Sequence, residues 1–252
     1  MKVKLALYQK KSDGVFDLDK IEKLIGRGVD FICLPEYCFI PLQAASQLEA
    51  AKDLKKNLDL LAALSVRLDS VLIGGSLIEE EAGKFYNTCY VFDRGWPVGK
   101  YRKVNLYRRE AGKGVSTGSR YEVFEIGGIR VGVLICADVL FPESYQKLAE
   151  MKPDVIFVPT TSPYRADDTL EAKERRDSDY FLAGAKTTSA YVAKCCAAGV
   201  LLGGRLQGRS LIAAPWGILK RVPFEDEDKE LVLTAELDFD ELKQYPLRHS
   251  GC

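Results

Sequence analysis

The segment GGIRVGVLICADVLFPE, residues 127–143, holds the features that decide the fold. It opens with two glycines, continues as a mostly apolar, β-branched run over 129–135, and changes character at Cys136. A short apolar run bounded by turn residues is typical of a strand that is buried on both faces. The segment therefore predicts a buried strand that ends at Cys136, followed by a helix over Pro142–Met151.

Outward from this segment, apolar strand patterns alternate with helical patterns along the whole chain. The expected strands are Val3–Gln9, Phe31–Glu36, Val71–Ile78, Tyr86–Asp93, Tyr121–Ile126, Ile129–Ile135, Val155–Pro159, Tyr191–Ala198, Ser210–Ala214 and Leu231–Glu236. The expected helices are Leu18–Gly26, Ser46–Leu68, Pro142–Met151, Asp168–Ser189 and Phe239–Gln244. Strands outnumber helices, and some neighbours look like hairpins, with EEEAGK (79–84) as an acidic turn. We therefore expect one α/β domain over residues 1–252, built in layers with mixed sheets.

The chain contains one histidine, His249, close to its C-terminus. Histidine-based triads need that side chain as a proton carrier, and histidine-based zinc or iron sites usually need two or three. We therefore expect no metal site, and acid–base chemistry that rests on carboxylates, lysines or tyrosines. The sequence also lacks GxGxxG and GxxxxGK[ST] motifs, which leaves nucleotide binding through such loops unsupported.

Composition narrows the partners and the compartment. Lys plus Arg and Asp plus Glu each total 36 of the 252 residues, and this balance argues against a nucleic-acid partner. No apolar run is long enough to cross a bilayer, so we expect no membrane partner. The seven cysteines show no CxxC spacing, which indicates free thiols in a reducing, cytoplasmic compartment.

Three polar residues stand out from the apolar patterns of the chain. Glu36 closes FICLPE (31–36), where partial desolvation would suit a carboxylate to general-base work. Cys136 closes VGVLIC, where its thiol would lie beside the N–H of Ala137, as acyl transfer requires. Lys103, in GKYRKVNLY (99–107), could point inward if carboxylates pair with it. Each also has an ordinary explanation: a solvated strand end, a packed cysteine and a cationic surface run.

Taken in this order, the segments resemble the nitrilase (carbon–nitrogen hydrolase) superfamily. FICLPE is similar to the family's glutamate strand, GKYRKVNLY to its lysine motif, and GGIRVGVLICADVLFPE to its cysteine motif. DVIFVPTTSP (154–163), RRDSDYFLAGAKTTSAYVAKCC (175–196) and RSLIAAPWG (209–217) are similar to later family segments. The chain departs from the pattern at Asn105, where histidine is usual, and at Ala137, where many amidases carry an aromatic residue. Thr188 and Ser189 stand in place of a Glu-Asn pair.

The resemblance implies a four-layer α-β-β-α sandwich with two mixed β-sheets, which usually forms homodimers or higher homo-oligomers. It implies that Glu36 is the general base, Lys103 the oxyanion stabiliser and Cys136 the nucleophile, with Glu110 as a second glutamate. No metal or organic cofactor is required. A lysine beside the cysteine would also favour the thiolate.

The reaction that the resemblance implies is hydrolysis of a small linear amide, or of a carbamoyl amide, through a cysteine acyl-enzyme. Nitrile hydrolysis is a less common outcome in the family. Acyl transfer to an amine, and a binding protein of the same fold without turnover, stay open as alternatives. The expected substrate-binding residues are Tyr107, Ala137, Thr161, Tyr164 and Arg165, with Tyr37 also in the pocket wall. Arg165 or Lys186 could bind a substrate carboxylate, which would favour ω-amides; both could equally be surface charges.

Overall fold

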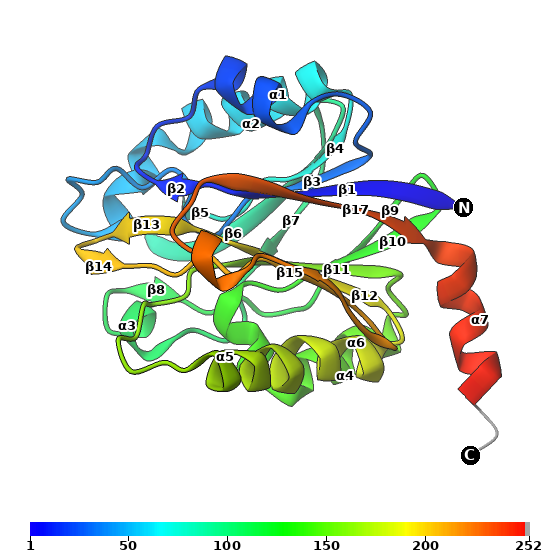
Figure 1. The fold of residues 1–252 in the computed structure, drawn as a ribbon. Coiled ribbons are helices and arrows are strands. Elements are labelled where there is room, and N and C mark those ends of the chain that lie inside the picture. Colours follow the sequence, from blue (N-terminus) through cyan, green and yellow to red (C-terminus); the bar gives the residue numbers. More distant parts are fainter. Residues whose placement is uncertain (250–252) are drawn as a thin grey trace.

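Two β-sheets lie face to face between outer layers of helices (Figure 1). The structure is a computed structural model that describes residues 1–249, with the side chains of all of these except residues 108, 109 and 246–249. The first sheet contains β1 (Lys2–Gln9), β3 (Phe31–Cys33), β4 (Val71–Ile73), β5 (Leu77–Glu81), β6 (Lys84–Asp93), β7 (Trp96–Arg102), β8 (Val115–Ser116) and β17 (Leu231–Asp238). Its strand order is β17-β1-β3-β4-β6-β5, and β7 and β8 also pair with β6.

The second sheet has the strand order β16-β15-β12-β11-β10-β9. These strands are β9 (Val123–Ile126), β10 (Ile129–Val133), β11 (Val155–Thr160), β12 (Tyr191–Cys196), β15 (Leu211–Ala214) and β16 (Gly217–Arg221). A small sheet at one end joins β2 (Lys11–Ser12), β13 (Ala198–Leu201) and β14 (Gly204–Arg205). The pairs β10–β11 and β11–β12 are parallel, whereas β9–β10, β12–β15 and β15–β16 are antiparallel. The predicted mixed α/β architecture is therefore confirmed.

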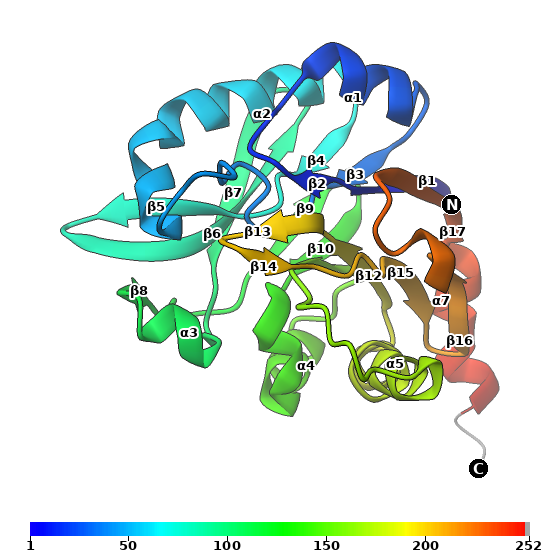
Figure 2. The ribbon, with the colours of Figure 1, turned by 60° about the vertical axis from the view of Figure 1, so that its left-hand side comes forward.

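Helices cover the outer face of each sheet (Figures 1 and 2). α1 (Leu18–Ile25) and α2 (Leu54–Leu68) lie over the first sheet, and α4 (Pro142–Glu150), α5 (Leu170–Arg176) and α6 (Ala183–Thr188) over the second. The remaining helical elements are α3 (Arg108–Ala111), α7 (Phe239–His249), and the short turns η1 (Gln47–Asp53), η2 (Cys136–Leu140), η3 (Asp177–Leu182) and η4 (Phe224–Asp226). No helix in the described part of the chain is long and apolar enough to span a membrane.

Alternate side chains of the central strands enter different apolar cores, because successive residues of a strand point to opposite faces. Phe31 and Cys33 of β3 pack into the core between the sheets, whereas Ile32 packs into the core beneath α1 and α2. Likewise Val133 faces the central core and Leu134 the core beneath the second helical layer. Both faces of these strands are buried, which explains why the sequence runs through them as continuous apolar stretches.

The structure corrects the predicted strand Val71–Ile78. It is two strands, β4 and β5, separated by a turn at Gly74 and Gly75. Gly75 has φ +66°, and a Cβ there would lie 2.2 Å from the Pro35 carbonyl oxygen, so only glycine lets the two segments approach. The acidic residues of EEEAGK belong to β5, and the hairpin turns at Ala82 and Gly83 instead.

Further elements differ from the prediction, and three of them bear on the site or on the long helices. β7 was not predicted, because its first residues are exposed and include a proline, so they lack the alternation of a half-buried strand. The predicted helix Ser46–Leu68 begins as the 3₁₀ turn η1. The predicted helix Asp168–Ser189 is interrupted by the π-helical turn η3, which begins where the buried Asp177 accepts a hydrogen bond from Arg209 Nε (2.8 Å).

Asp138 joins the segment after β7 to the turn that carries Cys136. Its carboxylate is fully buried and accepts hydrogen bonds from the Asn105 N–H (2.7 Å), the Ile135 N–H (2.8 Å) and the Tyr101 hydroxyl (2.8 Å). Burial raises the pKa of this carboxyl to about 6, although those hydrogen bonds oppose the rise. The two segments are therefore held together by one buried acidic side chain.

This raised pKa predicts an unusual pH dependence of stability. The folded state binds the Asp138 proton more tightly than the unfolded chain, whose ordinary pKa is 3.8. The proton on Asp138 therefore stabilises the folded state fully below about pH 4, and this stabilisation is lost as the pH rises to about 6. The loss amounts to up to about 3 kcal/mol, at 1.36 kcal/mol for each pKa unit. Asp138→Asn should be less stable and should lack this pH-dependent part. Urea unfolding of both proteins from pH 4.5 to 7 tests it, and parallel pH profiles would contradict it.

Candidate active site

Polar residues that follow four strand ends meet between the two sheets. Glu36 comes three residues after β3, Lys103 directly after β7, Cys136 three residues after β10, and Thr161 directly after β11. β3 lies in the first sheet and β11 in the second, yet the Thr161 N–H donates to Glu36 Oε2 at 3.0 Å. Cys136 has φ +44°, a left-handed conformation that turns the chain sharply at the thiol.

Lys103 is a buried ammonium held between two carboxylates. Its side chain is 1% exposed, and Nζ lies 2.9 Å from Glu36 Oε1 and 2.6 Å from Glu110 Oε2. Burial alone would lower the pKa of Lys103, but the neighbouring carboxylates of Glu36 and Glu110 raise it above its ordinary value. Lys103 is therefore a fixed cation in the interior.

Glu36 accepts four hydrogen bonds, two on each oxygen. Oε1 accepts from Lys103 Nζ and from Asn87 Nδ2, both at 2.9 Å. Oε2 accepts from the Thr161 N–H at 3.0 Å and from Thr161 Oγ1 at 2.5 Å. A carboxylate offers about four acceptor positions, so this network uses all those of Glu36.

Glu110 is bound in the same way. Its Oε2 accepts from Lys103 Nζ and from the Tyr107 N–H (2.8 Å), and its Oε1 from Asn87 Nδ2 (2.9 Å) and the Tyr37 hydroxyl (2.6 Å). Burial raises the pKa of Glu110, but Lys103 and these hydrogen bonds outweigh it, so the pKa lies below its ordinary value. The Asn87 amide thus bridges two carboxylates that Lys103 also bridges.

Cys136 is linked to this network through Thr161. Its Sγ donates to the Thr161 carbonyl oxygen at 3.3 Å, and the same residue holds Glu36. Burial raises the pKa of the thiol and the charge of Glu36 adds to this, whereas Lys103 acts in the opposite direction without prevailing. Lys103 thus favours the thiolate, as expected, but burial and Glu36 outweigh it and hold the pKa of the thiol above its ordinary value.

The expected substrate-binding residues are distributed unevenly. Thr161 lies inside the network, and the buried Ala137 directly follows Cys136. Tyr107 contributes its backbone N–H, while its side chain is 47% exposed. Tyr164 and Arg165 are exposed, and Tyr164 lies under the Arg205 guanidinium (4.2 Å to the ring centroid).

Two further positions change the sequence interpretation. Lys186 precedes the start of β12, which pairs with the start of β11, so it lies at the opposite end of the sheet from Cys136. This position does not fit the suggested role in binding a substrate carboxylate. The sequence analysis missed Asn87. Its only signal in the sequence is an asparagine within the strand pattern over 86–93, and the structure shows that its side chain is fully buried in β6.

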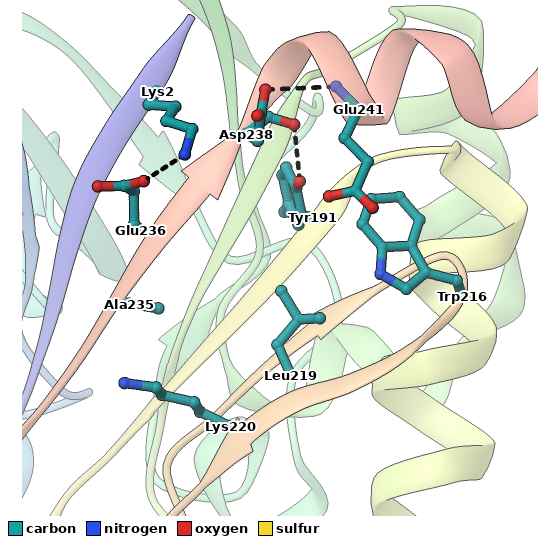
Figure 3. A pocket seen from close by; sticks show the side chains of 9 residues that line it. All are labelled: Lys2, Tyr191, Trp216, Leu219, Lys220, Ala235, Glu236, Asp238 and Glu241. Atoms are coloured by element: carbon teal, nitrogen blue, oxygen red, sulfur yellow. Dashed lines mark hydrogen bonds and ion pairs between the residues drawn. The ribbon is translucent and has the colours of Figure 1, made fainter.

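A cavity of about 360 Å³ lies away from these residues, between β16, β17 and the start of α7 (Figure 3). Its wall includes Lys2 and Tyr191, which begin β1 and β12, whereas Glu36 and Cys136 follow the other ends of parallel strands. Its lysines already have partners: Lys2 pairs with Glu236 at 3.0 Å, and Lys220 donates to the Thr234 carbonyl. In the described part of the chain, no group of three or more histidine, cysteine or acidic residues could hold a metal ion.

Comparison with known proteins identifies relatives of this chain. The sequence model of the family Carbon-nitrogen hydrolase matches residues 9–247. The chain is 30% identical to omega-amidase NIT2-B of Xenopus laevis over 94% of its length and 89% of the relative's. It is 26% identical to 2-oxoglutaramate amidase of Bacillus subtilis (strain 168), over 93% and 88%.

Solved structures share the fold. The chain is similar to a carbon–nitrogen hydrolase from Helicobacter pylori G27, with a TM-score of 0.83, 18% identity and coverage of 99% of this chain and 94% of the other. It is also similar to Nit3 of Saccharomyces cerevisiae, a member of branch 10 of the nitrilase superfamily, with a TM-score of 0.80, 22% identity and coverage of 98% and 94%. From the family match and the sequence relatives, the chain is a hydrolase that acts on carbon–nitrogen bonds other than peptide bonds, and it belongs to the carbon–nitrogen hydrolase family of the nitrilase superfamily.

Proposed function

We propose that this chain hydrolyses a small linear amide through an acyl-enzyme on Cys136. The observation that carries the proposal is the buried Lys103 ammonium between Glu36 and Glu110, with the Cys136 thiol joined to Glu36 through Thr161. An unpaired buried ammonium is very costly, and even a paired one adds little to stability, so a catalytic use explains this cluster better than a structural one.

In the proposed acylation step, Glu36 takes the thiol proton and the sulfur attacks the amide carbonyl carbon. The carbonyl oxygen becomes an oxyanion, which Lys103 and the N–H of Ala137 stabilise by about 3–4 kcal/mol for each good donor. Glu36 then returns the proton to the leaving nitrogen, and the C–N bond breaks to release ammonia or an amine. Cys136 is left as a thioester.

In the second half, Glu36 is again a carboxylate and accepts a proton from water as it attacks the thioester. The same oxyanion donors act a second time, and the thiolate leaves and recovers the proton from Glu36. One carboxylate thus serves both halves, which is the task of histidine in other hydrolases. Glu110 accepts from Lys103, and we propose that it positions that ammonium.

For the substrate, we propose an ω-amide with a free carboxylate, with a carbamoyl amide as a second candidate. Relatives named omega-amidase, 2-oxoglutaramate amidase and deaminated glutathione amidase support this choice. We propose that Tyr107, Ala137, Thr161, Tyr164 and Arg165 line the substrate site, with Arg165 on the substrate carboxylate.

We further propose that residues 1–252 form one domain that assembles as a homodimer or higher homo-oligomer in the cytoplasm. The family resemblance supports the assembly. Six cysteines in the described part of the chain are free thiols, which supports a reducing compartment.

Replacing the nucleophile tests the mechanism. Cys136→Ala should abolish ammonia release from a panel of linear amides, because no other group can carry the acyl chain. The fold should persist, since the thiol makes one weak hydrogen bond, so urea unfolding should change by less than about 1 kcal/mol. Cys196→Ala, at a buried cysteine outside the network, is the control and should retain activity. Turnover by a folded Cys136→Ala protein would refute the mechanism.

Trapping with an amine separates hydrolysis from acyl transfer. A thioester at Cys136 should react with added hydroxylamine to give a hydroxamate, which mass spectrometry detects. We expect water to remain the main acceptor when physiological amines are present instead. Amine adducts in excess of the hydrolysis product would favour the acyl-transfer alternative, and neither product from any amide would favour a binding protein without turnover.

The carboxylate-binding proposal predicts a selective loss. Arg165→Ala should raise KM for an ω-amide with a free carboxylate by about 10- to 100-fold, the effect of losing a charge-assisted hydrogen bond of about 1.4 to 2.8 kcal/mol. An uncharged amide of equal length should be unaffected. Lys186→Ala, at the far end of the sheet, serves as the matched control. An unchanged KM for the ω-amide in Arg165→Ala would exclude Arg165 from binding the carboxylate.

A further inference from the structure

Thr161 contacts both ends of the proton transfer that opens the reaction. Its carbonyl oxygen accepts from Cys136 Sγ at 3.3 Å, and its hydroxyl donates to Glu36 Oε2 at 2.5 Å. Its backbone N–H holds the same carboxylate oxygen at 3.0 Å. Thr161 thus lies between the thiol that gives the proton and the carboxylate that would receive it.

The four partners of Glu36 differ in what they can do when that carboxylate becomes an acid. Lys103 Nζ, Asn87 Nδ2 and the Thr161 N–H can only donate hydrogen bonds. The Asn87 amide cannot reverse by flipping, because its Nδ2 also serves the Glu110 carboxylate and an amide oxygen there would face two acceptors. A hydroxyl, in contrast, can donate or accept by rotating about its C–O bond.

A proton on Glu36 therefore has one favourable position. On Oε1 it would point at two obligate donors, Lys103 and Asn87. On Oε2 it would meet the Thr161 hydroxyl, which can turn round and accept it. A buried O–H group without an acceptor would lose its hydrogen bond, which costs free energy. A partner that can accept as well as donate avoids this cost.

We propose that the Thr161 hydroxyl is a reversible hydrogen-bond switch, donating to Glu36 as carboxylate and accepting from its Oε2–H as acid. The inference rests on the proposed function, because it needs Glu36 to cycle between these forms. The S–H bond of Cys136 breaks, its electron pair stays on sulfur for attack, and the proton forms the Oε2–H bond. The Thr161 hydroxyl proton rotates away and stays on its own oxygen. Thr161 is thus a positioning residue that acts through Glu36.

This role is an alternative to the substrate-site role that was proposed above for Thr161, and it predicts a different outcome. A substrate contact would change KM and would leave the intrinsic reactivity of Cys136 toward a small alkylating agent unaltered. The switch would change kcat and the alkylation rate together, because both begin with loss of the thiol proton to Glu36. The two assignments can therefore be separated by experiment.

The test compares Thr161→Val, which keeps the shape without the hydroxyl, with Thr161→Ser, which keeps the hydroxyl. Thr160→Val is the matched control: Thr160 is the adjacent buried threonine, and its hydroxyl donates to the Val158 carbonyl (2.9 Å) instead of to Glu36. Two rates are measured in the full chain at neutral pH. The first is the hydrolysis of a linear amide, and the second is the alkylation of Cys136 by iodoacetamide, which mass spectrometry monitors. Urea unfolding of each variant is measured alongside.

We expect Thr161→Val to lower kcat and the Cys136 alkylation rate in parallel, by about 10- to 100-fold, at the lower end of what acid–base assistance contributes. KM should hardly change, Thr161→Ser should recover most of both rates, and Thr160→Val should resemble the native protein. A raised KM with normal alkylation in Thr161→Val would overturn the proposal, as would equal rates in all variants. If the native chain hydrolyses no amide while alkylation still depends on the Thr161 hydroxyl, the proposed function fails and the switch stands.

Discussion

The site depends on one buried ammonium. Lys103 is 1% exposed, and an ammonium in that position persists only if negative charge lies directly against it. Glu36 and Glu110 supply that charge, but two buried carboxylates repel each other and need donors of their own. Asn87, Thr161, Tyr37 and the Tyr107 N–H supply these donors, so each carboxylate is saturated with four hydrogen bonds. The arrangement of the surrounding residues follows from the need to neutralise one buried cation.

The fold satisfies this requirement by facing two sheets toward each other. Strand ends are where a buried chain can first carry polar side chains, and here the ends of β3, β7, β10 and β11 converge from both sheets. Tight approaches hold these ends in place: Gly75 lets the β4–β5 turn pass against Pro35, and Asp138 fastens the Cys136 turn to the segment after Lys103. The distances between these side chains are thus set by short segments that follow buried strands.

Much of this could be predicted from the sequence, because fully buried strands appear as continuous apolar runs and their polar ends are conspicuous. Glu36 and Cys136 were singled out in this way, Lys103 was singled out in a cationic run between aromatic residues, and the family resemblance added Glu110. Asn87 escaped, because a single buried amide in a strand looks the same whether it bridges two carboxylates or one backbone group. The exposed strand β7 and the π-turn at Asp177 escaped because long-range contacts decide them. The raised pKa of the Cys136 thiol depends on burial and on Glu36, which only the three-dimensional arrangement provides.

The pairing of β1 with β17 has a consequence for how the protein is made. Lys2 lies opposite Asp238 and Gln9 opposite Leu231, so β1 pairs with residues that are synthesised some 230 positions later. During translation the first sheet, which carries Glu36 and Lys103, has an unpaired edge until residues 231–238 leave the ribosome. Such long-range closure slows folding and exposes strand edges to aggregation. The first sheet can therefore be completed only after both halves of the chain have been made.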